Sequence, residues 1–217
     1  SPPKVVLHTS EMEGFDVASG FNMVLAILHI HARFENLGGT SARVTGIEYS
    51  SEPFQFGTAY GDDEPTIHVG WTSNEDHHVG AAKWSVNRHC EIEEAFIRFR
   101  NPSIYSWAFG EPASEAEDFY DAGLSSANGR YFRISYVHEL LHAFGLAHSN
   151  ASYAMLNYGD RPFANRDPGA QVMPLPDDIR GLRYLYPANC DRTEIAVLTT
   201  WYEENTTSTD TYPAAQQ

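Results

Sequence analysis

Short apolar or alternating stretches predict the strands of a sheet, because successive side chains of a strand point to opposite faces. In chain order they cover residues 4–8, 44–49, 66–71 and 95–100. Between the first two, residues 17–34 carry apolar side chains at helical spacing and predict a long helix that ends at Gly38-Gly39. We expect it to bury one side against the sheet, formed by Phe21, Val24, Leu25, Leu28 and Ala32.

The later part of the chain is less regular. Residues 101–128 form a long acidic connection with aromatic side chains, which either shapes access to a site or is an inert surface insertion. After a short apolar stretch at 195–198, the polar run that starts at Glu203 is typical of an exposed linker. We predict one domain over residues 1–190 and a C-terminal extension over 191–217.

The composition excludes some classes of binding partner. A chain of 217 residues suits one domain with a substantial core. Lys and Arg total 14 against 29 for Asp and Glu, and the net charge of -15 argues against nucleic acid or an anionic membrane as partner. No apolar run approaches membrane-spanning length and no signal peptide opens the chain, so we expect no membrane insertion and expect Ser1 to begin a mature or trimmed chain. We also expect a secreted protein and a monomer.

The sequence HELLHAFGLAH at residues 138–148 carries the candidate chemistry. On a helix, His138 and His142 lie on one face and can reach one metal ion. The helix must then stop and the chain turn back before His148 can bind, and Gly145 permits that turn because it can adopt the left-handed conformation. Three imidazoles leave the fourth tetrahedral position to water, as in catalytic zinc sites. The alternatives are surface histidines or a structural metal site.

The glutamate of this sequence suggests a reaction. Zinc lowers the pKa of water, and Glu139 is positioned to take its proton as the water attacks a carbonyl and to pass that proton to the leaving amine. The spacing therefore predicts attack of a zinc-activated water on a carbonyl group.

Residues 138–148 resemble the extended zinc motif of the metzincin metallopeptidases. The resemblance implies that His138, His142 and His148 are zinc ligands and Glu139 is the general base. Met155 follows the third histidine by seven residues and fits the methionine turn of that family, the alternative being a residue of the core.

Further features resemble the matrixin-like branch. Ser149 is the usual matrixin residue after the third ligand, and residues 176–186 resemble the start of the matrixin C-terminal helix. The resemblance implies that Asp177 and Asp178 tie this helix to the methionine turn and to the mature N-terminus, and the alternative is helix N-capping. Tyr158 departs from the astacin and serralysin pattern by one position, and it either lines the substrate pocket, contacts the oxyanion or packs.

The resemblance also implies the fold. It is an α/β domain with a twisted, mostly parallel sheet, one antiparallel edge strand, a backing helix, the zinc-binding helix and a small C-terminal lobe with a helix. Residues 80–86 correspond by order to the edge strand that borders the metzincin cleft. A peptide substrate would add to this strand through main-chain hydrogen bonds. The residues concerned are Ala81, Ala82, Lys83 and Trp84.

Other metals and the cysteines have weaker signals. The second, structural zinc of matrixins is not predicted, because only scattered histidines are available, namely His68, His77, His78 and His89. Asp62, Asp63 and Glu64 either hold calcium or form a solvated turn. Cys90 and Cys190 are expected to form one long-range disulfide of a secreted domain, against the alternative of two unpaired thiols.

Together these features predict a secreted zinc endopeptidase that acts on extended polypeptides. The alternative is a zinc-containing binding or adhesion module without catalytic activity. The intact Glu139 favours the enzyme.

Overall fold

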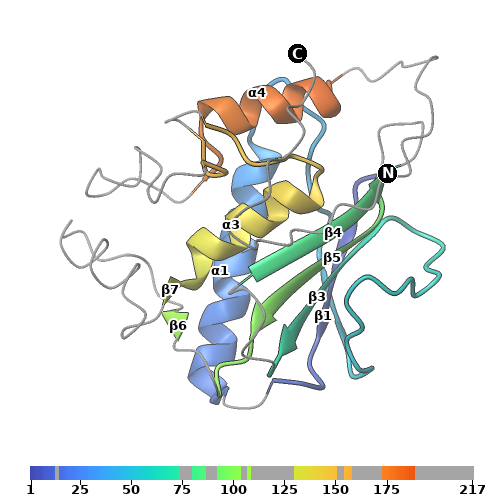
Figure 1. Ribbon diagram of the computed structural model, residues 1–217, viewed down its shortest axis with the longest axis vertical. Coiled ribbons are helices and arrows are strands. Elements are labelled where there is room, and N and C mark those ends of the chain that lie inside the picture. Colours follow the sequence, from blue (N-terminus) through green and yellow to red (C-terminus); the bar gives the residue numbers. More distant parts are fainter. Residues whose placement is uncertain are drawn as a thin grey trace.

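The computed structural model describes residues 1–12, 15–73, 80–86, 92–103, 107–108, 130–150, 154–157 and 173–188. For residues 80, 81, 83–86, 108, 130 and 131 it describes the backbone alone. These parts of the chain hold three helices and a five-stranded sheet, so the predicted α/β class is confirmed (Figure 1).

The sheet has the strand order β2-β1-β3-β5-β4. Its first four strands in that order are mutually parallel, and β4 pairs antiparallel with β5 at one edge. The central strands β1, β3 and β5 are mostly buried on both faces, so apolar side chains occur on both faces of these strands. The bounds are β1 Lys4–His8, β2 Ile47–Ser50, β3 Thr66–Thr72, β4 Gly80–Val86 and β5 Ile92–Arg100.

Helix α1 (Val17–Glu35) packs against the sheet, but with a different side from the one predicted. Phe21 and Leu28 are 64% and 45% exposed, and Ala32 is exposed too. The helix is apolar around most of its circumference, so two stripes have helical spacing, and contact with the rest of the core selects the other one. The buried residues are Met23, Ala26, Ile27, Ile30, His31 and Phe34.

The same helix bears on the predicted absence of membrane insertion. By length and composition α1 could cross a membrane, which corrects the expectation that no apolar run reaches that length. Core helices of soluble proteins and signal sequences meet the same criterion. Here the buried stripe of α1 belongs to the hydrophobic core.

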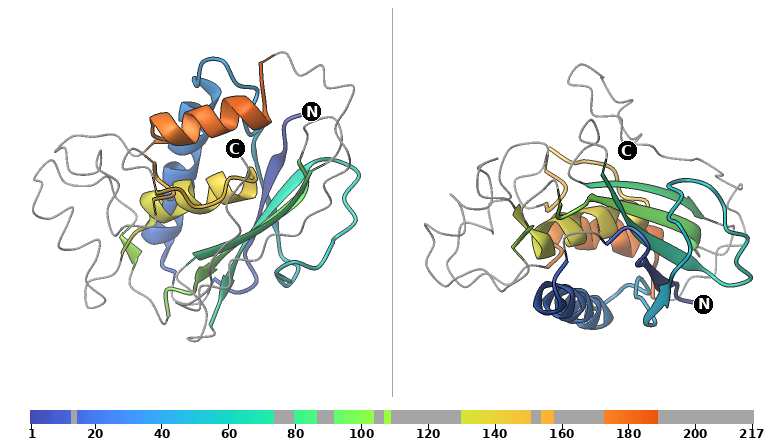
Figure 2. Two further views of the ribbon diagram at one scale, coloured as in Figure 1. Left: turned by 45° about the horizontal axis from the view of Figure 1, so that its top comes forward. Right: turned by 90° about the horizontal axis from the view of Figure 1, so that it is seen from below.

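The remaining helices complete the core on the same side of the sheet as α1 (Figures 1 and 2). Helix α3 (Phe132–Ala143) packs on α1, and directly after its end the ring of Phe144 stacks on that of Phe34 with centroids 5.6 Å apart. A short two-stranded pair, β6 (Trp107–Ala108) with β7 (Arg130–Tyr131), precedes α3 in the chain. Helix α4 (Pro176–Leu185) follows α3. The loop at residues 51–65 covers the opposite face of the sheet (Figure 2, left).

Candidate metal centre

Helix α3 and the turn that ends it bring three histidines together. His138 and His142 lie one turn apart on α3. The helix then ends in a Schellman motif, in which Leu146 N–H donates to Leu141 O (3.1 Å) and Gly145 N–H to His142 O (2.7 Å). Gly145 has φ 87°, so the predicted left-handed turn is confirmed. This turn sends the chain back so that His148 reaches the other two histidines.

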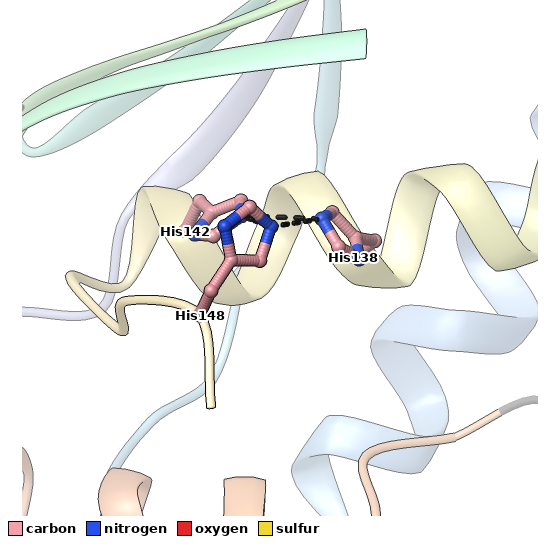
Figure 3. Close-up of side chains that lie close together, drawn as sticks. All are labelled: His138, His142 and His148. Atoms are coloured by element: carbon pink, nitrogen blue, oxygen red, sulfur yellow. Dashed lines mark hydrogen bonds between the residues drawn. The ribbon is translucent and has the colours of Figure 1, made fainter. Parts of the chain in front are cut away.

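The three imidazole rings converge through their Nε2 atoms (Figure 3). The separations are 3.1 Å between His138 and His148, 3.2 Å between His138 and His142, and 3.3 Å between His142 and His148. Tetrahedral zinc with nitrogen ligands at about 2.0–2.1 Å separates those ligands by about 3.3 Å. The three side chains therefore fit one metal ion.

Backbone carbonyls fix which nitrogen of each helical histidine carries the hydrogen. His138 Nδ1–H donates to Met155 O (3.0 Å), and His142 Nδ1–H donates to Leu146 O (2.7 Å). With the hydrogen on Nδ1, the neutral rings present lone pairs at their two Nε2 atoms, which cannot hydrogen-bond to each other. His148 can supply only one hydrogen to them. A cation bound between the rings satisfies all three nitrogens.

The surroundings of His142 and His148 favour the neutral ring that a metal ligand needs. His142 is fully buried, and this burial, reinforced by the neighbouring His138 and His148, holds its pKa well below the usual range. Burial also lowers the pKa of His148. Binding of a cation therefore does not have to displace a proton from these two rings near neutral pH.

Glu139 is the residue next to the first ligand on α3. Its side chain is 5% exposed. Among the described residues, the group that could share one metal ion consists of His138, His142 and His148, and Glu139 is not part of it. Glu139 is thus a buried carboxylate that directly follows the first metal-binding histidine in the chain.

A turn at Ala154–Asn157 contacts the metal centre through the backbone of Met155. Met155 is buried, and its carbonyl is the acceptor for His138. Its N–H donates to Asp178 Oδ2 at 2.7 Å, so α4 holds the turn in place. Ser149 N–H donates to Leu156 O at 2.8 Å, which ties the segment after His148 to the same turn.

The two aspartates of α4 have different contacts. Asp178 is 3% exposed and also accepts from Leu175 N–H (2.8 Å) and Leu156 N–H (3.4 Å), so it both caps the helix and binds the methionine turn. Asp177 accepts from Ser149 Oγ–H (2.8 Å) and pairs with Arg180 (3.5 Å). The predicted link to the turn is confirmed for Asp178, whereas Asp177 contacts Ser149 and Arg180, and the predicted tie to the N-terminus stays a prediction.

The predicted substrate strand lies beside α3. β4 is one of the two edge strands of the described sheet and packs against that helix (Figure 1). Ala82 is buried, whereas for Ala81, Lys83 and Trp84 only the backbone is described. The backbone of β4 therefore lies beside the helix that carries His138 and His142.

Several predicted features lie outside the described residues. These are Tyr158, the cysteines Cys90 and Cys190, the histidines His77, His78 and His89, most of the 101–128 connection and the 191–217 extension. The predicted calcium ligands Asp62, Asp63 and Glu64 are described, but Asp62 contacts His68 instead of grouping with its two acidic neighbours.

Sequence reasoning missed the two carbonyl acceptors at Leu146 and Met155. A backbone carbonyl has no signature in the sequence, and only the conformation of the turns aims it at a ring. Comparison of the chain with known protein families and with curated proteins found no match.

Proposed function

We propose that this chain is a secreted zinc endopeptidase of the metzincin type, from its matrixin-like branch. The observation that carries the proposal is the group of three Nε2 atoms within 3.3 Å of one another, next to the buried Glu139. A structural site with four protein ligands would leave no position for a reacting group. The three-histidine group leaves one.

Zinc is the metal proposed because imidazole nitrogens in a tetrahedral, open arrangement suit it. When bound by His138, His142 and His148, it would supply Lewis-acid polarisation of the scissile carbonyl and a lower pKa for water. The carbonyls of Leu146 and Met155 keep the helical histidines oriented for this role.

Glu139 is the proposed general base and acid. Its carboxylate would accept a proton from the attacking water and then donate that proton to the leaving amine. Burial keeps competing solvent away from the carboxylate. Glu139 and the ligand His138 are consecutive residues of α3, so the helix backbone keeps the carboxylate next to the metal-binding group.

The edge strand β4 is the proposed binding element for the substrate backbone. An extended peptide can pair with an edge strand through main-chain hydrogen bonds, which give affinity without demanding a particular side chain. Because β4 packs against α3, a peptide on it would carry its scissile bond past the metal centre. We therefore propose polypeptides as substrates.

The test is Glu139→Gln, which keeps the volume and removes the base. We expect unchanged zinc content, because the three histidines remain, and a fall in peptide hydrolysis of about 10²- to 10⁴-fold. Glu35→Gln, at the exposed end of α1, is the matched control and should keep full activity. Zinc content and hydrolysis of a diverse peptide library are measured on the same preparations.

Two outcomes would contradict the proposal. Turnover by Glu139→Gln close to that of the wild type would exclude Glu139 as the base. A zinc-loaded wild type that hydrolyses no peptide in the library would instead indicate a binding module.

A further inference from the structure

A second group of metal-ligating side chains lies on the face of the sheet that the helices do not cover. His68 Nε2 is 2.8 Å from Asp62 Oδ2 and 3.4 Å from Glu94 Oε1, and the three ligand atoms lie within 4.8 Å of one another. They come from the 51–65 loop, from β3 and from β5. His68 alternates along β3 with Ile67 and Val69, which face the helical core, so this group is separate from the histidine centre.

The hydrogen bonds around His68 are one hydrogen short if its ring and that of His8 are neutral. His8 Nδ1–H donates to Glu52 O at 3.0 Å, which leaves His8 Nε2 as an acceptor. His68 Nδ1–H can donate to it at 3.0 Å. The lone pair of His68 Nε2 then faces the carboxylate of Asp62 at 2.8 Å. Three contacts need three hydrogens and two neutral rings hold two, so a positive charge belongs between His68 and the carboxylates.

A metal ion fits this position better than a proton does. A proton would bridge one nitrogen and one oxygen, whereas the oxygens of two carboxylates approach the same nitrogen. The hydrogen bond from His68 to His8 is the arrangement that orients metal-binding histidines. Tyr60 N–H donates to Glu94 Oε1 at 2.8 Å and orients that carboxylate. Burial also lowers the pKa of His68 to about 4, which favours the neutral ring that a metal needs.

We propose that Asp62, His68 and Glu94 bind a second divalent transition-metal ion, of the Zn²⁺ class, that fastens the 51–65 loop to the sheet. A buried imidazole with two carboxylates suits Zn²⁺ and similar ions, whereas Ca²⁺ prefers a site built from oxygen alone. The two candidate sites also differ in their ligands, since the histidine centre offers three nitrogen atoms and this group offers one nitrogen and two carboxylates.

The loop already packs closely around this group, which gives the ion a structural role. The Tyr60 ring stacks on His68 with centroids 4.2 Å apart. Phe54 lies so close to Gly70 that a Cβ there would be 2.0 Å from its Cγ. An ion bound by Asp62 from the loop, His68 from β3 and Glu94 from β5 would fix the loop against the sheet.

The experiment counts zinc ions per chain by elemental analysis after zinc loading and gel filtration of the full chain. We expect two ions in the wild type, one in Asp62→Asn and two in the matched control Asp63→Asn, which removes the neighbouring carboxylate. Asp62 is exposed, so Asp62→Asn should fold, and its peptide hydrolysis should be unchanged. His8→Phe keeps the ring packing but loses the acceptor, and should weaken the second ion by about 10- to 100-fold.

The two sites can fail separately. The same number of ions in Asp62→Asn as in the wild type would overturn the second site, because His68 would then be held by a proton alone. One ion that disappears in Asp62→Asn but persists in His148→Ala would support the second site and reject the first.

Discussion

Removing the Asp178 carboxylate should destabilise the protein and weaken metal binding together. In Asp178→Ala, the N–H groups of Met155 and Leu175 lose acceptors at 2.7 and 2.8 Å in a buried setting. Each buried N–H without an acceptor costs about 1–3 kcal/mol, while the third contact at 3.4 Å contributes little.

The charge of Asp178 offsets part of this cost. Burial raises the pKa of its carboxyl against the three N–H donors that favour the charged form, so the substitution also removes an unfavourably buried charge. We expect a net loss of about 3 kcal/mol in the free energy of unfolding, or about 6–12 °C in Tm for a domain of this size. Because Met155 O orients His138, zinc affinity should fall by about 10- to 100-fold.

Urea unfolding of the metal-free protein and zinc titration measure the two effects separately. Asp178→Asn keeps an oxygen acceptor and should lie between the wild type and Asp178→Ala. Asp177→Ala is the control, since this half-exposed carboxylate accepts from one hydroxyl and should lose no more than about 1 kcal/mol. If Asp178→Ala were no less stable than Asp177→Ala, the turn would not depend on this carboxylate.

Four further predictions test other contacts. His148→Ala should lose one zinc ion per chain on dialysis, and full retention would exclude it as a ligand. Met155→Leu should keep that ion and lose less than about 1.5 kcal/mol in unfolding free energy, because the carbonyl contacts the ring; loss of zinc with an intact fold would implicate the sulfur. Gly145→Ala should cost about 1–2 kcal/mol because φ there is 87°, and urea unfolding that shows no loss would contradict the strained turn. Burial lowers the pKa of His31 to about 4 from 6.5. Below pH 6.5 the unfolded chain therefore binds a proton that the folded chain does not, and the free energy of unfolding decreases as the pH is lowered. His31→Gln should remove about 2–3 kcal/mol of that loss between pH 7 and 4.5 in metal-free protein, and an unchanged pH profile would contradict it.

The ligands of the candidate centre could be predicted because their geometry is local. Four residues along a helix put His138 and His142 on one face whatever the rest of the chain does. The need for a turn before His148 follows from the same geometry, and Gly145 provides it. The positions of the strands were also predictable from short apolar runs, although β2 starts at Ile47 and β5 at Ile92, three residues from the expected positions.

The second metal group shows where this reasoning stops. His8, His68 and Glu94 lie on three different strands, and only the parallel register brings them to one place. The available signal was a polar side chain inside each of three apolar strands. That signal does not identify which polar side chains meet, because pairing and register depend on long-range contacts.

The sequence alone determined the local chemistry of this protein: the three histidines, the adjacent glutamate, the glycine turn and the approximate extent of the strands. These depend on backbone preferences and spacing over a few residues. Tertiary structure decided which stripe of α1 is buried, which carbonyls orient the histidines and which carboxylates surround His68. The physical reason is that burial and hydrogen-bond partners arise from segments far apart in the chain, and their packing selects among alternatives that are equivalent in local sequence.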